Sequence, residues 1–337
     1  FKQKTAYEIY QCDWSSDVCS SDLMSGAGGP EVLRPTTRPV PQPAAGEVLV
    51  KVTAAGVNGP DMMQRKGLYP APKGASDLLG LEVSGEVVAV GGKVSRWTTG
   101  DKLVALTNGG GYAEYVTIDA EHCLPVPSGV AMVDAAGLPE TYFTVWSNVF
   151  NGAVLAEGET FLVHGGAGGI GATCIQLGKA FGAKVLATDS PAARCDFCRS
   201  LGADRVIDYR TEDFVDIVRE AGGANVILDI VGGANIEKNM KAASHDARII
   251  QLAFAQGSKV DINLMPVMLK RLTYTGSTLR TRPSAYKARV ARELEEKVWP
   301  LIGAGRIKPV VNATFALADA AKAHALDRKS TRLNSSH

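Results

Sequence analysis

The feature that most constrains this chain is a glycine-rich turn directly after a short apolar run. Residues 161–171 read FLVHGGAGGIG, in which Gly166, Gly168 and Gly171 complete the pattern G-x-G-x-x-G. Between a strand and a helix, the first glycine allows a tight turn, the second lets a pyrophosphate approach the backbone, and the third lets the helix pack close to the sheet. The motif predicts a dinucleotide site at a helix N-terminus, where unpaired N–H groups and the helix dipole favour an anion.

The sequence after the turn supports this interpretation, because a glycine pattern alone is a weak signal in a chain with 36 glycines. Residues 172–182 have helical apolar spacing and end on Gly182, a natural helix stop. Residues 184–188 form a second apolar run, which leads into Asp189. The chain is therefore predicted to contain a β-α-β unit whose acidic residue stands where a ribose hydroxyl needs an acceptor.

Strand and helix patterns continue to alternate toward the C-terminus. Further strands are predicted at 205–207, 225–231, 248–252 and 272–276, and helices at 191–201 and 213–221. Such alternation is typical of an α/β fold with a doubly wound parallel sheet of Rossmann type. In that fold the ligand binds at the carboxyl ends of the strands.

The part of the chain before the glycine turn has a different pattern. Strand candidates at 47–57, 82–90, 102–106 and 111–118 are separated by glycine-rich turns. Short strands at this spacing predict a compact, β-rich domain with barrel-like closure. An alanine-rich helical segment, interrupted by Pro139, then leads toward the glycine turn.

Composition narrows the function classes. At 337 residues and 45% apolar content, the chain can bury the cores of two domains. The formal net charge of +1, without a basic run, gives no reason to invoke nucleic acid, and the apolar runs are too short to span a membrane. Six scattered cysteines fit a reducing compartment, so we expect a cytoplasmic protein.

Cys195 and Cys198 form a C-x-x-C pair, which can be a redox pair or half of a zinc site. The pair falls within the helix predicted at 191–201, and neither a second C-x-x-C nor a histidine pair accompanies it. We therefore favour cysteines packed on a helix over a redox or metal role.

Both ends of the chain look foreign to the fold. Residues 1–23 precede Met24 and lack the basic start and long apolar centre of a secretory signal. This segment and residues 327–337 resemble translated sequencing-adapter sequence, and a short disordered native extension is the alternative. Either interpretation predicts poor packing of residues 1–23 and 328–337.

A series of separated motifs carries a family resemblance. They are NGPDMMQRKGLYP at 58–70, LGLEVSG at 79–85, GD at 100–101, GGYAEYV at 110–116, LPE at 138–140 and HGGAGGIG at 164–171. In this order they resemble the zinc-independent quinone oxidoreductase branch of the medium-chain dehydrogenase/reductase superfamily, and within it the tumour-suppressor-inducible and zeta-crystallin-like subgroup. The resemblance covers nearly all of residues 24–326.

The resemblance implies a domain organisation. It assigns 24–144 and 286–326 to a GroES-like catalytic domain, 145–285 to a Rossmann dinucleotide-binding domain, and 1–23 and 327–337 to foreign-looking extensions. The nicotinamide would lie in the cleft between the domains, and the protein would form homodimers or homotetramers. After Leu326 the family continues into a final strand of the catalytic domain, and this chain departs from the family there.

Asn58 and Leu81 stand at two positions where zinc-dependent relatives have metal ligands. Zinc-dependent relatives place a cysteine where this chain has Asn58 and a Gly-His-Glu where it has Gly80-Leu81-Glu82. Neither side chain supplies a thiolate or an imidazole, so no metal site is expected. The acceptor must then take a hydride readily, as a quinone or an activated enal does. The protein would mainly orient the rings and stabilise the developing anion.

The resemblance places candidate catalytic residues at Asn58, Tyr69 and Thr144. Asn58 would contact the nicotinamide side of the cofactor, Tyr69 would border the substrate pocket, and Thr144 would lie beside the nicotinamide. Each has a structural alternative: a turn residue, an aromatic in a proline-flanked loop and a β-branched core position in a helix, respectively. Asp61 and Arg65 lie four residues apart, and we expect them to form an ion pair on a helix face.

The residues expected to hold the cofactor surround the glycine turn or follow later strands. They are Gly166, Gly168, Gly169, Ile170, Gly171, Asp189, Arg194, Tyr209, Gly232, Ala253 and Phe254. Asp189 argues for NADH, whereas Arg194 and Tyr209 match phosphate-binding positions of the family and argue for NADPH. The alternative for Arg194 is a solvated residue on a helix, and the alternative for Tyr209 is an aromatic residue on an edge strand. We expect NADPH to be preferred over NADH, provided that Asp189 turns to solvent or pairs with Arg194.

The leading hypothesis is NAD(P)H-dependent, metal-free reduction of quinones or related enones, with a small-molecule acceptor as the partner. Reduction of alkenal double bonds uses the same hydride geometry and is the nearest alternative. A cofactor-binding structural or RNA-binding role, as in crystallin-like relatives, is the alternative from another class, and the near-neutral charge disfavours it. His164, at the end of the first strand, is expected to be packed or hydrogen-bonded rather than catalytic.

Overall fold

The chain forms two compact units in this computed structural model, which describes residues 4–8 and 18–332, with side chains for 18–326. One unit is Thr144–Leu279, here called the parallel-sheet unit. The other, here called the β-rich unit, comprises the described parts of Lys2–Phe143 and Arg280–His337. The chain thus returns to the β-rich unit at Arg280, a few residues before the expected boundary at 285/286.

The parallel-sheet unit is built on a sheet with the strand order β11-β10-β9-β12-β13-β14. The strands are β9 (Thr160–His164), β10 (Lys184–Asp189), β11 (Arg205–Asp208), β12 (Ala224–Asp229), β13 (Ala243–Gln251) and β14 (Thr273–Gly276). Every neighbouring pair is parallel. This order is the doubly wound Rossmann arrangement, in which the direction of winding reverses between β9 and β12.

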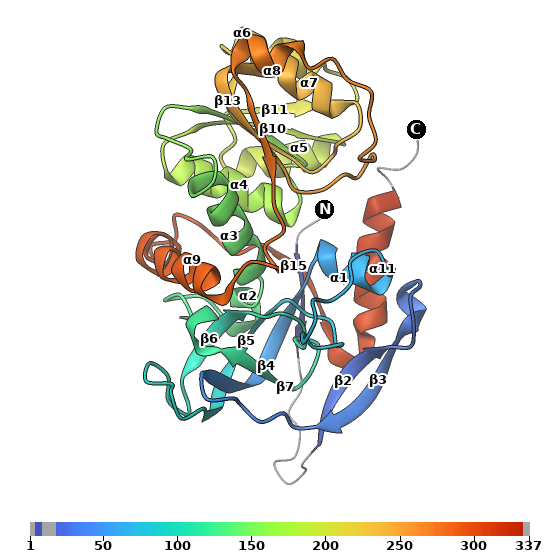
Figure 1. Ribbon diagram of the computed structural model, residues 1–337, viewed down its shortest axis with the longest axis vertical. Coiled ribbons are helices and arrows are strands. Elements are labelled where there is room, and N and C mark those ends of the chain that lie inside the picture. The colour runs from blue at the N-terminus through green and yellow to red at the C-terminus, as the bar shows by residue number, and fades with distance from the viewer. Residues whose placement is uncertain (1–3, 9–17, 333–337) are drawn as a thin grey trace. The chain divides into compact units, whose positions relative to one another are not determined.

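Helices lie on both faces of this sheet. They are α4 (Gly169–Ala180), α5 (Ala192–Ser200), α6 (Phe214–Glu220), α7 (Asn235–Ala242) and α8 (Met265–Lys270). Figure 1 shows α4 and α5 on one side and α6, α7 and α8 on the other. Leu162 and Ile227 pack with Phe214 and Met240 on the second side, and the intervening strand residues are buried as well. Burial on both faces explains why the central strands β9 and β12 are rich in apolar residues.

The β-rich unit is built on a sheet with the order β15-β1-β4-β5-β6-β8, with β7 also paired to β4. The strands are β1 (Lys4–Glu8), β4 (Glu47–Val57), β5 (Glu82–Val90), β6 (Lys102–Leu106), β7 (Tyr115–Asp119), β8 (Cys123–Pro125) and β15 (Val311–Ala316). Alternate residues of β4, namely Val48, Val50 and Val52, are buried with Val83 and Leu103 in one core. This period of two is that of a sheet facing a core.

Helices complete the β-rich unit. They are α1 (Gly59–Arg65), α2 (Met132–Ala135), α3 (Pro139–Val145), α9 (Ser284–Lys297), α10 (Trp299–Gly303) and α11 (Ala320–Arg332). Helix α3 begins at Pro139, because proline suits the first turn of a helix and interrupts its interior. The helical segment predicted before the glycine turn is therefore divided at this residue, as expected.

The N-terminal segment corrects one prediction. Poor packing of residues 1–23 is wrong for Val18 onward, because β2 (Val18–Met24) pairs antiparallel with β3 (Leu33–Pro39) and Cys19 and Asp22 are buried. The β1 backbone also pairs with β15 and β4. Edge strands offer unpaired backbone groups to any extended segment, whatever its side-chain pattern. At the other end, the backbone of residues 327–332 continues helix α11, and the remaining parts of the predicted extensions, 1–3, 9–17 and 333–337, lie outside the described residues.

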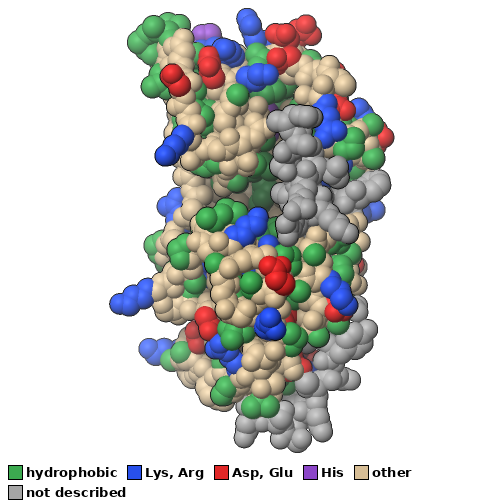
Figure 2. Space-filling model, turned by 90° about the vertical axis from the view of Figure 1, so that its right-hand side faces the viewer, with side chains coloured by type: hydrophobic (Ala, Val, Ile, Leu, Met, Phe, Trp, Pro, Cys, Tyr) green, Lys and Arg blue, Asp and Glu red, His purple; other side chains and the backbone are tan. Residues whose placement is uncertain are grey.

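The described surface carries two further observations. No helix there combines the length and the apolar character that crossing a bilayer requires. On the face shown in Figure 2, basic and acidic side chains are interspersed rather than gathered by sign. That face therefore lacks a basic stripe of the kind that binds the phosphate backbone of a nucleic acid.

Candidate functional site

The glycine turn joins β9 to α4 at the carboxyl edge of the parallel sheet. Gly165 N and Gly166 N donate to Thr188 O at 3.0 and 3.1 Å. A Cβ on Gly171 would lie 2.2 Å from Gly165 O, so the turn closes only around glycine at this position. A Cβ on Gly168 would meet only Gly165 O, at 3.3 Å, which leaves the outer side of the turn open. A compact turn that is open at the second glycine and leads into a helix N-terminus fits a pyrophosphate.

Asp189, at the end of β10, is only 3% exposed and already has its partners. Its Oδ2 accepts from Ala167 N at 2.8 Å and its Oδ1 from Ser190 N at 2.7 Å. Arg194, on α5, donates Nε to Oδ1 at 2.5 Å and Nη2 to Oδ2 at 2.8 Å. Tyr209 follows β11 and is 44% exposed; burial raises its pKa, and the charge of Asp189 adds to the rise. Asp189 therefore holds the glycine turn and Arg194 together rather than facing an open space.

The remaining predicted cofactor residues of this unit also lie beyond strand ends. Gly169 and Ile170 begin α4, directly after the turn. Gly232 follows β12, and its N–H donates to Asp229 Oδ1 at 3.1 Å. Ala253 and Phe254 follow β13 and are exposed. The structure thus brings them to the same edge of the sheet as the glycine turn.

Asn58 stands at the N-terminus of α1 in the β-rich unit and is buried. Its Nδ2 donates to Glu82 Oε1 at 2.8 Å, and Glu82 Oε2 accepts from Glu140 N at 2.9 Å. Glu82 packs over Gly56, where a Cβ would lie 1.8 Å from Oε1. This bond to the buried carboxylate fixes the plane of the Asn58 side-chain amide. The side-chain oxygen Oδ1 therefore lies on the side away from Glu82. Glu82 belongs to the family motif at 79–85, but it was not predicted to have this role, because it is 24 residues away from Asn58 and only the tertiary fold brings the two together.

Asp61 and Arg65 correct another expectation. The Asp61 carboxylate accepts the backbone N–H groups of Asn58 and Gly80, at 2.9 and 3.0 Å, and burial raises its pKa to about 7. Arg65 Nη1 contacts His324 Nδ1 at 3.1 Å. The predicted helix-face ion pair is therefore wrong. Both positions of α1 face the protein interior, where tertiary partners replace the i,i+4 contact of an exposed helix.

Tyr69 lies in the loop after α1 and is half-buried. Arg280 Cζ is 6.0 Å from the centre of its ring, within range of a cation–π contact. Arg280 is itself buried and donates to Gln64 Oε1 at 2.5 Å and to Asn108 O at 2.7 Å. Burial raises the pKa of Tyr69, while the charge of Arg280 lowers it to a lesser extent. Arg280 was also missed by the sequence-based prediction, because it meets Tyr69 only through the tertiary fold.

Thr144 is the third candidate catalytic residue and begins the parallel-sheet unit. Its side chain is half-buried, and its carbonyl oxygen accepts from Ser147 Oγ at 3.1 Å and from Asn148 Nδ2 at 2.8 Å. These bonds involve its backbone and leave the role of its hydroxyl a prediction.

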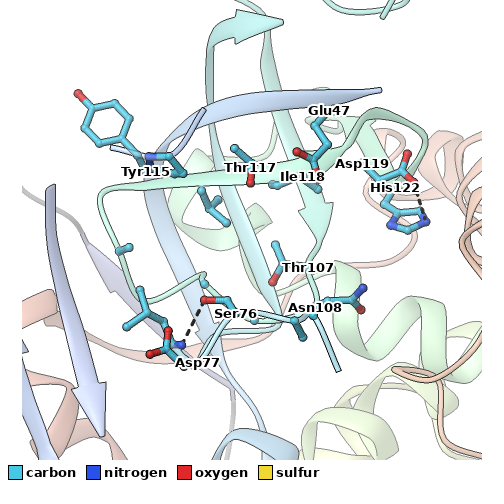
Figure 3. A pocket seen from close by; sticks show the side chains of 18 of the residues that line it. Glu47, Ser76, Asp77, Thr107, Asn108, Tyr115, Thr117, Ile118, Asp119 and His122 are labelled. Carbon is cyan, nitrogen blue, oxygen red and sulfur yellow. Dashed lines mark hydrogen bonds and ion pairs between the residues drawn. The ribbon is translucent and has the colours of Figure 1, made fainter. Parts of the chain in front are cut away.

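A separate cavity of about 630 Å³ lies in the β-rich unit, beside β7 (Figure 3). Its described lining contains neither Asn58 nor Tyr69. At its rim Ser284 Oγ donates to Asp119 at 2.5 Å, and His122 Nε2 lies 3.1 Å from both Ser284 Oγ and Ser284 O. Because the serine hydroxyl donates to the carboxylate, the imidazole does not act as its base, and this trio is not a nucleophilic triad.

The predicted packing of the cysteine pair on a helix is confirmed. Cys195 and Cys198 are both buried on α5, and burial raises the pKa of both thiols, that of Cys198 to about 12. A thiol with a raised pKa is a poor nucleophile and a poor metal ligand at neutral pH. Among the residues that the structure describes, no group of three or more His, Cys, Asp or Glu could hold a metal ion.

Comparisons with known proteins agree with this geometry. Residues 44–128 match the alcohol dehydrogenase GroES-like domain family, and residues 169–296 match the zinc-binding dehydrogenase family. The quinone oxidoreductase of Mus musculus is 30% identical over 307 residues, which cover 88% of this chain and 90% of that protein. The quinone oxidoreductase of Pseudomonas aeruginosa is 32% identical over 305 residues, covering 88% and 92%.

A solved structure extends the agreement to the whole fold. The Escherichia coli quinone oxidoreductase, complexed with NADPH, aligns with a TM-score of 0.80 at 28% identity, covering 92% of this chain and 96% of that chain. The α/β fold predicted from the sequence, with a Rossmann unit and a GroES-like unit, is thereby confirmed. The chain belongs to the quinone oxidoreductase branch of the medium-chain dehydrogenase/reductase superfamily of oxidoreductases.

Proposed function

We propose that this chain reduces quinones or related enones by hydride transfer from NADPH, without a metal ion. The observation that carries the proposal is the glycine turn, which is closed around Gly171, open at Gly168 and backed by a salt-bridged Asp189. Relatives named quinone oxidoreductase that cover most of the chain support the choice of acceptor. When bound, the nicotinamide would supply the hydride, and the residues below would bind and orient the reactants.

The Asp189–Arg194 pair favours NADPH over NADH. A free carboxylate at this position would accept from the ribose 2′-hydroxyl and repel a 2′-phosphate. Here the carboxylate accepts from backbone N–H groups and from Arg194, so its charge is compensated. Arg194 Nη1 is buried and has no hydrogen-bond partner among the described residues, so one guanidinium donor is left for a phosphate. Tyr209, within the electrostatic reach of both groups, would add a hydroxyl donor.

On the acceptor side, Asn58 and Tyr69 would orient the ring and meet its charge. Hydride transfer to a quinone leaves an anionic oxygen, which nearby donors and positive charge stabilise. Tyr69 carries a hydroxyl donor, and buried Arg280 over its ring carries the positive charge. The Asn58 amide is held in one orientation by Glu82, so it needs no rearrangement when reactants bind.

Metal independence is part of the proposal and rests on donor chemistry. Asn58 uses its amide N–H₂ to bind Glu82, and Leu81 is an apolar residue of the core. Neither can replace the thiolate or imidazole of a three-ligand zinc site. Exhaustive chelation should leave turnover unchanged, and elemental analysis should find substoichiometric zinc. Stoichiometric zinc that is lost together with activity would contradict this part.

The deciding experiment follows NADPH oxidation with a panel of ortho-quinones, para-quinones and enals, and repeats it with NADH. We expect turnover with at least one quinone and a lower Michaelis constant for NADPH than for NADH. Turnover restricted to enals would shift the assignment to alkenal double-bond reduction. Failure of every acceptor, with neither cofactor bound in a titration, would overturn the proposal.

We also propose that the protein is a homodimer or homotetramer that associates through the β14 edge of the parallel sheet. Within the described residues β14 pairs only with β13, so its other side presents unpaired backbone groups. Leu264, Met265, Met268 and Leu269, at and before α8, are each more than half exposed. Apolar patches of this kind mark association surfaces. Light scattering should show a dimer or larger, and Met268→Asp should lower the molecular mass; a monomeric parent would refute the proposal.

A further inference from the structure

A row of buried polar side chains crosses the parallel sheet at its carboxyl edge. Thr188 of β10 is the register partner of His164 of β9. Asp229 ends β12 one position after Leu228, which pairs with Val163. Thr188, His164 and Asp229 are all nearly inaccessible to solvent. Since these strands are adjacent and parallel, the three side chains lie next to one another where the winding direction of the sheet reverses.

Hydrogen bonds link this row through Asn239 of α7. His164 Nδ1 lies 2.9 Å from Thr188 Oγ1, and His164 Nε2 lies 2.7 Å from Asn239 Oδ1. Asn239 Nδ2 donates to Asp229 Oδ2 at 2.8 Å. A carboxylate only accepts, so the amide N–H₂ must face Asp229 and the amide oxygen must face the imidazole. His164 therefore donates from Nε2, and in its neutral form, which burial favours by lowering the pKa of the imidazole, Nδ1 accepts the Thr188 hydroxyl.

The two ends of the row hold two different turns. Thr188 O accepts the N–H groups of Gly165 and Gly166, which open the glycine turn. Asp229 Oδ1 accepts the N–H groups of Val231 and Gly232 at 2.5 and 3.1 Å. Gly232 has a φ of +67°, a backbone conformation that glycine adopts readily because it has no side chain. The bonds to Asp229 hold the turn in this conformation. One chain of hydrogen bonds thus joins both turns that we assign to the cofactor.

The state of His164 is consistent with this arrangement. Burial lowers the pKa of the imidazole, and the neighbouring Asp229 opposes that shift only in part. The ring also packs edge-on against Phe214 of α6, at 4.8 Å between centres. His164 is buried and hydrogen-bonded, as expected, and its position between the two turns suggests a more specific task.

We infer that His164 is a positioning residue that sets the distance between the glycine turn and the Gly232 turn, and so the affinity for the dinucleotide. The inference rests on the proposed function, because both turns are cofactor-binding only if a dinucleotide is bound. The residue would act through Asn239 and Thr188, without contact with the cofactor. Its loss should weaken cofactor binding and raise the Michaelis constant for NADPH, and leave kcat nearly unchanged at saturating cofactor.

The test compares His164→Leu with a control substitution at another buried residue on the same side of the sheet. Val218→Ala removes buried volume from α6, on the same side of the sheet, without touching either turn. Leucine fills the space of histidine but leaves Asn239 Oδ1 and the Thr188 hydroxyl without their partner, which disturbs both ends of the row. We expect His164→Leu to raise the Kd for NADPH about tenfold or more, and Val218→Ala to change it less than about twofold. The apo-protein unfolding temperature of each variant separates this effect from general destabilisation.

Two further variants keep the test decisive. His164→Gln retains an N–H donor near Asn239 and should recover much of the affinity. Thr188→Val removes the hydroxyl donor but keeps the carbonyl that holds the glycine turn, and it replaces His164→Leu if that variant does not fold. Equal loss of affinity in His164→Leu and Val218→Ala, unchanged affinity in His164→Leu, or equal losses in His164→Leu and His164→Gln, would overturn the inference alone. If the parent protein binds neither NADPH nor NADH, the proposed function fails and this inference fails with it.

Discussion

The two units build their candidate sites from different chemical groups. In the parallel-sheet unit, the turn that would meet a pyrophosphate consists of backbone N–H groups from one stretch, 165–171, and its shape depends on absent side chains. In the β-rich unit, side chains are held by partners from remote segments, as Asn58 is by Glu82. A site made of backbone tolerates changes of side-chain chemistry but not of volume. A site made of side chains tolerates equal volume but not a lost hydrogen bond.

The largest expected effect tests the volume rule within one turn. Gly171→Ala would place a methyl group 2.2 Å from Gly165 O, and we expect it to destabilise the protein by about 3 kcal/mol or more. Gly168→Ala meets only a 3.3 Å contact, so it should keep the fold and lose cofactor affinity, at least about tenfold. Thermal unfolding and cofactor titration of the pair measure the two effects. Equal stability of both variants would refute the geometry of the turn.

The next effect tests the hydrogen-bond rule. Glu82→Gln keeps the volume but turns one N–H₂ toward a donor, either Asn58 Nδ2 or Glu140 N. The mismatch costs about 1–3 kcal/mol, and kcat/KM should fall about 10- to 100-fold with little change in cofactor affinity. Glu86→Gln, on the same strand but exposed, is the matched control and should behave as the parent. Normal turnover in Glu82→Gln would show that the fixed amide of Asn58 is not needed.

A smaller effect distinguishes the two cofactors. Arg194→Ala removes the cation beside Asp189 and should raise the Michaelis constant for NADPH about tenfold while barely changing that for NADH. Arg199→Ala, on the same helix but exposed, is the control. Equal effects on both cofactors, or an NADH preference in the parent, would mean that Asp189 decides the choice.

The smallest expected effect is a change in how steeply the free energy of unfolding depends on pH, caused by a residue of the β-rich unit. His324 is buried beside Arg65 and Tyr112, and burial lowers its pKa from 6.5 to about 3. Between these values the unfolded chain binds a proton that the folded chain does not, so the stability that His324 contributes is lost as pH falls below 6.5. The slope is at most about 1.4 kcal/mol per pH unit. Denaturant unfolding at pH 5 and 6 should show a shallower decline for His324→Phe than for the parent, and parallel declines would contradict the assignment.

The difference between the units also decides what the sequence could predict. The glycine turn and its flanking strands are contiguous, so local periodicity predicted the parallel sheet, although the predicted strands 225–231 and 248–252 run past the observed ends at Asp229 and Gln251. Arg280 and Gln64 are 216 residues apart, and no local pattern shows that they meet. Asp61 and Arg65 were paired wrongly because helical spacing says which residues share a face, but not whether that face is exposed. Strand β2 was missed because its pairing depends on an available edge.

The bridge between Asp189 and Arg194 has an evolutionary consequence. The carboxylate that binding of an unphosphorylated ribose needs is already present in this chain, held by the N–H groups of Ala167 and Ser190, and Arg194 compensates its charge. A single substitution at position 194 would remove this cation without rebuilding the turn. If the proposed cofactor assignment holds, one mutational step therefore separates preference for the phosphorylated coenzyme from preference for the unphosphorylated one, and that step leaves the β-rich unit unchanged.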